Sequence, residues 1–290
     1  MIYNNENING NFLDPNFSEY DYLKKIVEYL NLNLDDNYHL YIIHDKFNSK
    51  IINEKNVVKI AIHIGNEVKF SNKNYDKFDY IFRFYLEHKC DYKKIFPISI
   101  GYNSSGKDNN IIFRNNIKLT NRKCDVFFMG NKNVRKSFYN SVKKYIDIYD
   151  LRFTDGFRKG LSINEYLDQL NNSKICLVPS GSSPETYRYT EAFASGCIVI
   201  TTSKVDSWFY ENSPAIFIKK WSDFNENLVK SILSSNLDIK YNNNLKYYND
   251  KLSPEANAQY ILNVLKNPNH INSKARKRSW LTKILKIRII

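Results

Sequence analysis

From residue 120 onward, apolar runs typical of strands alternate with segments of helical periodicity, and this alternation constrains the fold more than any other feature. The strand-like runs are "CDVFFMG", "YDLRFT", "KICLVPS" and "CIVITT", and amphipathic segments separate them. One of these segments opens with the capping box Ser162-x-x-Glu165. Strands that alternate with helices form βαβ units, whose strands lie parallel in one sheet. The sequence therefore predicts an α/β fold for this half.

The first 118 residues carry a similar pattern. Residues 18–32 place apolar side chains at helical spacing. Three β-type runs follow, at 39–44, 57–64 and 80–86. The polar stretch at 103–110 is typical of a loop or linker. We therefore expect two Rossmann-like domains that face each other across a cleft, an N-terminal one at 1–118 and a C-terminal one at 119–266.

The remaining segment, 267–290, is strongly basic. It contributes more than half of the formal net charge of +13. Its cations are Lys274, Arg276, Lys277, Arg278, Lys283, Lys286 and Arg288. Apolar residues from Trp280 onward fall on one broad helical side, which is typical of an amphipathic anchor on an anionic membrane surface. A disordered solubilising tail is the alternative.

The chain shows no signal peptide and no apolar run of membrane-spanning length. We therefore expect a cytoplasmic protein, held peripherally at the inner face of the membrane by the tail.

A dense run of small and polar residues follows the expected strand at 174–180. Gly181 permits a tight turn there. Ser182 and Glu185 match the S-x-x-E capping box, and Pro184 suits the first helical position. We expect a helix from Pro184 onward, whose N-terminus lies at the carboxyl edge of the sheet.

Such a helix start favours a bound phosphate, because its free N–H groups and its dipole attract anions. Ser182, Ser183 and Thr186 add hydroxyl donors. Arg188 and Glu191 are three residues apart and share a helix face. The arginine suits a diphosphate and the carboxylate suits the vicinal hydroxyls of a ribose. The alternative is a surface ion pair between them, beside serines that only cap the helix.

The stretch "ICLVPSGSSPETYRYTEAFASGCIVI" resembles the core motif of the exostosin family of glycosyltransferases. The matching positions are Cys176, Leu177, Pro179, Gly181, Thr186, Arg188, Glu191, Ala192, Gly196 and Cys197. An earlier stretch, "VFFMGNKNVRKSF", resembles the family's strand, Gly-Asn loop and arginine, and Trp221 resembles a later landmark. The similarity covers roughly residues 120–235. Val199 stands where the family usually has proline.

This resemblance implies a GT-B fold and transfer of a sugar from a nucleotide diphosphate donor, with a UDP-sugar expected. The implied donor-binding residues are Gly130, Asn131, Arg135, Gly181, Ser182, Ser183, Thr186, Arg188 and Glu191. The implied acceptor is a glycan, expected to be a lipid-linked surface polysaccharide. No metal or other cofactor is expected, because cationic side chains and helix dipoles neutralise the leaving diphosphate. The sequence has no Asp-x-Asp triplet, and the absence of a Glu-x7-Glu pair favours inversion at the anomeric carbon.

In the N-terminal half, "GNE" at 65–67 resembles a segment of the α-1,3-fucosyltransferases, although Asn and Glu are swapped. This resemblance implies that Glu67 is the general base on the acceptor hydroxyl. A solvated loop residue is the alternative for Glu67, and His63 and His44 are other candidate bases. Arg83, inside an apolar run, either holds phosphate in the cleft or faces solvent on an edge strand.

Two other functions stay open. A non-enzymatic protein would bind nucleic acid through the basic tail, but the abundant aromatic residues lie in periodic apolar runs and suit a core better. The second open function is that of an epimerase, which would bind a nucleotide sugar on the same fold. The leading expectation is a glycosyltransferase with no nucleic-acid partner.

Overall fold

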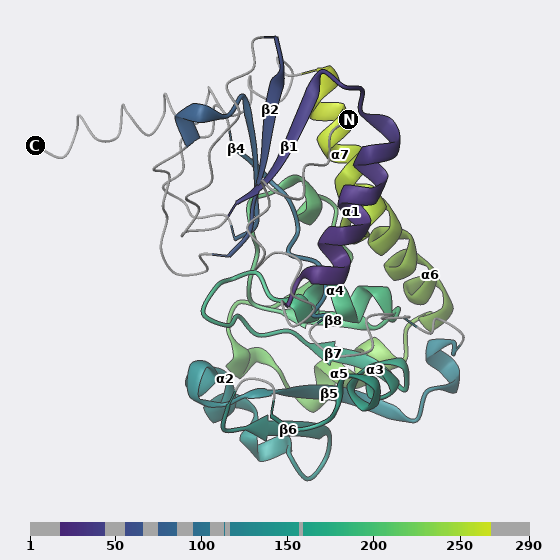
Figure 1. Cartoon of the computed structure of the whole chain (residues 1–290). Coiled ribbons are helices and arrows are strands. Elements are labelled where there is room, and N and C mark those ends of the chain that lie inside the picture. Colours follow the sequence, from purple (N-terminus) through teal and green to yellow (C-terminus); the bar gives the residue numbers. More distant parts are fainter. Residues whose placement is uncertain are drawn as a thin grey trace, which may run out of the picture. The chain divides into compact units, whose positions relative to one another are not determined.

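The computed structural model describes residues 18–43, 56–65, 75–85, 95–104, 113, 117–156 and 159–267. The chain divides into two compact units, each with its own parallel sheet. The first unit comprises Met1–Ser99 with Pro254–Ile290, and the second comprises Ile100–Ser253 (Figure 1). The expected α/β class with two Rossmann-like domains is confirmed, whereas their facing across a cleft stays a prediction. Of the basic tail, only Asn267 is described.

The first unit contains four parallel strands in the order β1-β2-β3-β4. They are β1 (Tyr38–Ile43), β2 (Val58–His63), β3 (Tyr80–Arg83) and β4 (Ile95–Pro97). Helix α1 (Tyr20–Asn33) buries one face, because Leu23, Ile26, Val27 and Leu30 recur at helical spacing. The first three strands and this helix agree with the sequence pattern, which did not predict β4.

Helix α7 (Pro254–Lys266) packs beside α1 and completes the first unit (Figure 1). Asn257 is fully buried there. Its Nδ2 donates to the hydroxyl of Tyr22 at 2.7 Å, and its Oδ1 accepts from the Ser99 N–H at 3.0 Å. The expected C-terminal domain, 119–266, included this helix together with the helices that precede it in sequence. In the structure the helix belongs to the first unit, so the expected domain boundaries differ from those of the two units.

The second unit contains five parallel strands in the order β6-β5-β7-β8-β9. They are β5 (Cys124–Asn131), β6 (Asp150–Thr154), β7 (Ser173–Leu177), β8 (Ile198–Thr201) and β9 (Ile216–Phe217). The chain moves from β5 to β6 on one side and then crosses back to β7 on the other. The strand order thus reverses between β5 and β7, and in such sheets ligands bind at the carboxyl ends of the strands beside that point.

Helices and apolar side chains cover both faces of this sheet. The helices are α2 (Lys136–Val142), α3 (Ile163–Asn171), α4 (Tyr187–Ala194), α5 (Glu226–Leu233) and α6 (Leu237–Tyr247). Successive strand residues point to opposite faces. Accordingly, Val126 and Phe128 enter one core cluster and Phe127 enters the other. The capping box predicted at the start of α3 is present, with Ser162 and Glu165 bonded reciprocally.

A buried arginine joins several elements at the amino edge of this sheet. Arg122 is 2% exposed. Its Nε donates to the carbonyl of Ile117, and its Nη1 donates to those of Leu170 and Ser173. Its Nη2 donates to the carbonyl of Ser195 at 2.6 Å. One guanidinium therefore satisfies carbonyls where α3 and α4 end and where β7 begins.

Gly196 and Cys197, which follow Ser195, pack at the same junction, where α3 and α4 end and β7 begins. Gly196 has a φ of +70°, and a Cβ built on it would lie 2.5 Å from Cε2 of Tyr241, so that only glycine fits. The Cys197 thiol donates to the Leu170 carbonyl at 3.2 Å. Burial raises the pKa of Cys197 to about 11 despite the nearby charge of Arg122, and the thiol therefore remains a protonated donor.

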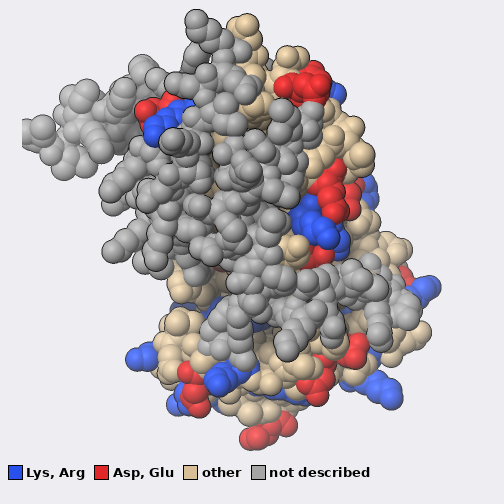
Figure 2. All heavy atoms as spheres, in the orientation of Figure 1, with Lys and Arg blue, Asp and Glu red and all other residues tan. Residues whose placement is uncertain are grey.

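Charged side chains on the second unit are mixed in sign. On the face shown in Figure 2, blue and red side chains alternate over the described surface of this unit. Several cations are paired with acids, including Lys132 with Asp155 and Lys246 with Asp250. No helix among the described residues is long and apolar enough to cross a membrane.

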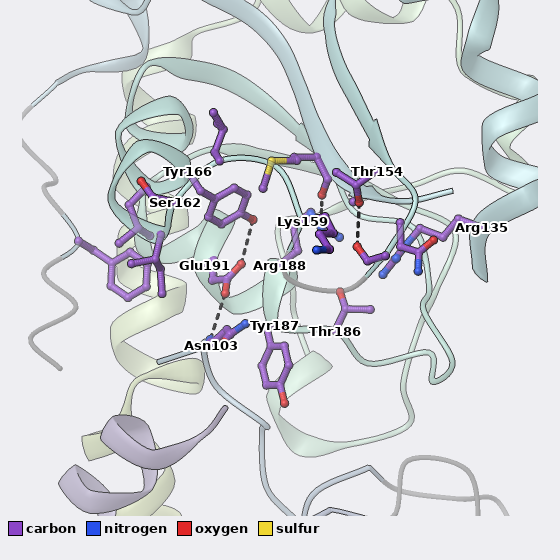
Figure 3. Close-up of a pocket in the computed structure, with 18 residues that line it drawn as sticks. Asn103, Arg135, Thr154, Lys159, Ser162, Tyr166, Thr186, Tyr187, Arg188 and Glu191 are labelled. Atoms are coloured by element: carbon purple, nitrogen blue, oxygen red, sulfur yellow. Dashed lines mark hydrogen bonds between the residues drawn. The ribbon is translucent and has the colours of Figure 1, made fainter. Parts of the chain in front are cut away.

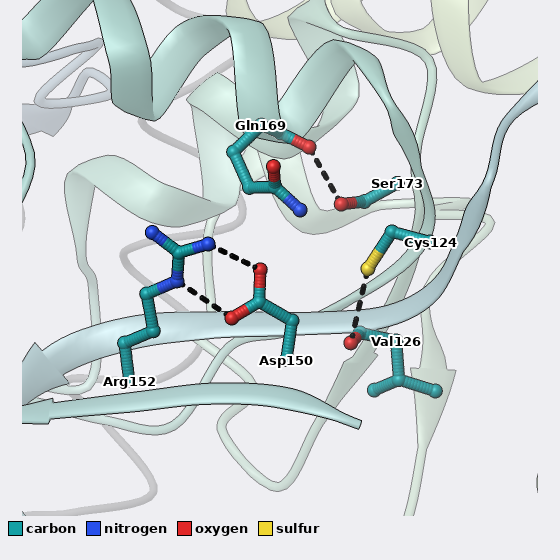
Figure 4. A network of polar contacts seen from close by, with 6 residues as sticks. All are labelled: Cys124, Val126, Asp150, Arg152, Gln169 and Ser173. Atoms are coloured by element: carbon teal, nitrogen blue, oxygen red, sulfur yellow. Dashed lines mark hydrogen bonds and ion pairs between the residues drawn. The ribbon is translucent and has the colours of Figure 1, made fainter. Parts of the chain in front are cut away.

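We predict that Arg122→Met destabilises the protein far more than Arg152→Met. Arg152 pairs bidentately with Asp150 on a partly exposed strand (Figure 4). Such an exposed pair contributes up to about 1 kcal/mol. Loss of Arg122 leaves several buried carbonyls without a donor, which is expected to lower the free energy of unfolding by about 3–5 kcal/mol. Urea denaturation measures both changes, and equal losses would contradict this role of Arg122.

Candidate functional site

A pocket of about 320 Å³ lies in the second unit, at the carboxyl ends of β5 and β6 and beside the start of α4 (Figure 3). Its lining residues are Asn103, Phe113, Met129, Gly130, Asn131, Arg135, Thr154, Gly156, Lys159, Leu161, Ser162, Ile163, Tyr166, Leu167, Thr186, Tyr187, Arg188 and Glu191. The pocket thus lies where the strand order reverses, as expected for a doubly wound sheet.

The chain between β7 and α4 differs from the prediction. Helix α4 begins at Tyr187, not at Pro184. The predicted capping box between Ser182 and Glu185 is not formed, because the carboxylate of Glu185 is buried and its Oε1 accepts the backbone N–H of Ile100 at 2.9 Å. A backbone donor far away in sequence has thus replaced the local capping interaction.

Neither predicted serine lines the pocket. Ser182 is exposed, and Ser183 is buried with its hydroxyl accepting the N–H of Glu185 at 3.3 Å. Thr186 does line the pocket, and its buried hydroxyl has no hydrogen-bond partner among the described residues. Gly181 stands just outside the lining, against the guanidinium of Arg135.

Two arginines meet at one glycine in the pocket wall. A Cβ built on Gly130 would lie 3.0 Å from Nη2 of Arg188 and 3.6 Å from Nη1 of Arg135. A Cβ on Gly181 would lie 3.1 Å from Nη2 of Arg135. Both glycines therefore leave the space that the two guanidinium groups need.

The hydrogen bond and the ring contact of Arg188 are both made with uncharged groups. Its Nη2 donates to the carbonyl of Met129, and its guanidinium carbon lies 4.9 Å from the ring centre of Phe128. Its buried Nε has no hydrogen-bond partner among the described residues. No salt bridge joins Arg188 to Glu191, so the alternative of a surface ion pair is wrong. An anionic ligand can supply the acceptor that this Nε lacks.

Glu191 lines the pocket between Tyr166 and Arg188 (Figure 3) and is 6% exposed. Its Oε1 accepts the N–H of Asn103 at 3.0 Å, and its Oε2 accepts the hydroxyl of Tyr166 at 2.9 Å. Burial raises the pKa of the Glu191 carboxyl, while the Asn103 N–H, the charge of Arg188 and the Tyr166 hydroxyl partly oppose this rise. Each oxygen retains a second lone pair, so the carboxylate can accept further hydrogen bonds.

The predicted donor-site residues are therefore only partly brought together. Six of them line the pocket: Gly130, Asn131, Arg135, Thr186, Arg188 and Glu191. Four further lining residues were not predicted. Thr154 is the last residue of the predicted strand β6, and Lys159 lies a few positions beyond it. Asn103 and Tyr166 reach the pocket through contacts that no local motif signals.

The candidate bases of the N-terminal half are mostly outside the described residues, which include neither Glu67 nor His44. His63 is described and buried, and its Nδ1 bonds both Nη1 of Arg83, at 2.9 Å, and the hydroxyl of Tyr75. Nδ1 is thus occupied by two protein partners. Arg83 is fully buried in β3, between β2 and β4, so the alternative of an exposed edge strand is wrong.

Within the described part of the chain, no three His, Cys, Asp or Glu side chains gather as a metal site. The pocket lining contains one acidic residue, Glu191. The absence of a metal requirement stays a prediction.

Comparison with known proteins gives no family. No family model matches the chain, and no curated protein matches it. The motif resemblance to the exostosin family therefore stays a prediction.

Solved structures show limited similarity. The chain is 13% identical to a chain of the glycosylation associate protein (Gap123) complex from Streptococcus agalactiae, with a TM-score of 0.45, over 83% of this chain and 57% of that one. It is 9% identical to a chain of the GtfA/B complex, with a TM-score of 0.43, over 86% of this chain and 60% of that one. It is 10% identical to AviGT4, a glycosyltransferase involved in avilamycin A biosynthesis, with a TM-score of 0.41, over 85% of this chain and 88% of that one. The chain thus spans less than two thirds of the first two, and these TM-scores, all below 0.5, carry no argument about activity.

We predict that the stability difference between the wild type and Glu191→Gln depends on pH. Because the pKa of Glu191 is higher in the folded than in the unfolded protein, protonation stabilises the folded state. The wild type is therefore most stable relative to the variant below the ordinary carboxyl pKa, and loses this advantage as pH rises through the raised pKa. Urea denaturation between about pH 4 and pH 8 measures the difference. A difference that is constant or grows with pH would contradict the burial of an ionisable group here.

Proposed function

We propose that this protein is a glycosyltransferase that moves a sugar from a nucleotide diphosphate donor to a glycan acceptor. One observation carries the proposal: the order of chemical groups along the pocket matches the order of parts in a nucleoside diphosphate. Apolar and aromatic side chains stand at one end, the Glu191 carboxylate in the middle, and Arg188 with Arg135 at the other end (Figure 3). A base, a ribose and a diphosphate follow one another in the same order.

The apolar end suits a nucleobase. The apolar and aromatic residues of the lining include Phe113, Leu161, Ile163, Tyr166 and Leu167, and Figure 3 shows Tyr166 on the side of Glu191 away from Arg135. An aromatic ring offers a base a stacking surface. The pocket volume of about 320 Å³ is at the lower limit of the roughly 300–1,000 Å³ range of ligand pockets. A nucleoside diphosphate would largely fill it, so the transferred sugar would extend beyond the cationic end.

The cationic end suits the leaving diphosphate. Arg135 and Arg188 meet at Gly130, and Lys159 adds a third positive charge to the pocket lining. Negative charge grows on the diphosphate as the bond to the sugar breaks. Fixed cations beside it stabilise that transition state without a metal ion. The buried, unpartnered hydroxyl of Thr186 supplies a further donor.

The remaining parts of the proposal rest on the sequence. The donor is a UDP-sugar, the acceptor is a lipid-linked surface glycan, and transfer inverts the anomeric carbon. Glu67 deprotonates the acceptor hydroxyl, and the basic tail at 267–290 holds the enzyme at the cytoplasmic face of an anionic membrane. Glu67 and nearly all of the tail lie outside the described residues.

We predict that the wild-type protein binds UDP or GDP and that Arg188→Ala weakens this binding by about 10- to 100-fold. A hydrogen bond to a charged group contributes about 1.5–3 kcal/mol, which corresponds to that range. Titration calorimetry measures the affinity. Arg152→Ala is the matched control, because it removes an arginine outside the pocket lining. If folded wild-type protein binds neither nucleotide, the proposed function is wrong; if both variants bind like the wild type, Arg188 is not in the site.

We also predict that Glu67→Gln keeps the donor affinity but lowers turnover by about 10²- to 10⁴-fold, the usual contribution of a general base. Glu28→Gln, on an exposed side chain of α1, is the control and should turn over normally. Acceptor-dependent release of the nucleoside diphosphate measures turnover. Normal turnover of Glu67→Gln would assign the base to another residue, with His44 as the next candidate.

A further inference from the structure

Three separate parts of the second unit meet at the carboxylate of Glu191. Glu191 itself belongs to α4, Tyr166 belongs to α3, and Asn103 belongs to the segment 100–104. Both carboxylate oxygens accept a protein donor, Oε1 from Asn103 and Oε2 from Tyr166 (Figure 3). The orientation of the carboxylate is therefore fixed from two sides before any ligand enters.

Tyr166 is itself rigidly placed. It is 8% exposed, and its ring centre lies 5.8 Å from that of Phe127 in the interior strand β5. Burial, reinforced by the charge of Glu191, raises the pKa of Tyr166 well above its usual range. The phenol therefore remains protonated and can only donate to Glu191.

This arrangement leaves Glu191 ready to accept two more hydrogen bonds. A carboxylate offers about four lone-pair sites, of which the protein uses two, so about two remain. Two neighbouring hydroxyls on a ribose would occupy them. A carboxylate that could rotate, or that bound a proton, would accept those hydroxyls less well.

We infer that Tyr166 is a positioning residue that makes the pocket prefer a ribonucleoside diphosphate over its 2′-deoxy analogue, by orienting Glu191 toward the 2′ and 3′ hydroxyls. The inference rests on the proposed function, because it takes a nucleoside diphosphate as the ligand. It adds a residue and a specificity that the sequence motif does not contain.

The test compares the affinities of UDP and 2′-deoxy-UDP, and of GDP and 2′-deoxy-GDP, by titration calorimetry. The wild type is expected to prefer the ribonucleotide by about tenfold, the value of one hydrogen bond to a charged acceptor. Tyr166→Phe keeps the ring but removes the donor. Its preference is expected to fall toward equal affinity, mainly through weaker binding of the ribonucleotide.

Tyr189→Phe is the matched control. Tyr189 lies on the same helix as Glu191 and is also buried, but its hydroxyl bonds Ser213 and Tyr247 instead of Glu191. This variant loses a buried phenol hydrogen bond without touching the carboxylate. It should therefore keep the ribose preference even where its melting temperature falls.

A second variant guards against misfolding of the first. Tyr166→His keeps an aromatic ring and an N–H donor, and is expected to retain part of the preference. An unchanged ratio of the two affinities in Tyr166→Phe, or equal affinities in the wild type, would overturn the inference while leaving the proposed function intact. Failure of the wild type to bind any of the four nucleotides would overturn the proposed function itself.

Discussion

The guanidinium of Arg122 is the interaction on which the geometry of the second unit depends. Three elements end or begin around it, and their carbonyl groups converge on one buried cation that has no acidic partner among the described residues. Carbonyl dipoles stabilise this charge, and the charge in turn satisfies carbonyls that would otherwise be buried without a donor. Since α3 and α4 both end there, their opposite ends, which line the pocket at Ile163 and Arg188, inherit a fixed spacing.

The pocket also contains a buried arginine group, but its hydrogen-bonding groups are satisfied differently from those of Arg122. Arg122 has its hydrogen-bonding groups distributed among protein carbonyls, whereas Arg188 keeps a buried Nε without a partner and stands beside a second guanidinium at Gly130. The first arrangement is complete within the protein. The second leaves a buried N–H of Arg188 without a protein acceptor in the described part of the chain, and a ligand can supply one. The two arginines of this unit thus differ in how far the protein itself satisfies their hydrogen-bonding groups.

The sequence predicted those features that local periodicity and local hydrogen bonds determine. The parallel strands and the capping box at Ser162 are of this kind. The start of α4 was predicted wrongly because Glu185 is satisfied by Ile100, which lies 85 positions away in sequence. Likewise, α7 follows the second unit in the chain but packs on α1. Tyr166 and Asn103 entered the site through the same kind of long-range contact, which no motif search along the chain detects.

The exostosin-like motif contains two kinds of residue: Gly196 and Cys197 pack at the amino edge of the sheet, and others line the pocket. Glycine is required by the ring of Tyr241, and the cysteine bonds a carbonyl beside Arg122, so both serve the junction at the amino edge. Thr186, Tyr187, Arg188 and Glu191 of the same motif line the pocket. Distant homologues that conserve only the Gly-Cys end would share this architecture without necessarily sharing a substrate. Differences among them in what the pocket binds should therefore be traced through its lining residues, such as Arg135, Arg188 and Glu191.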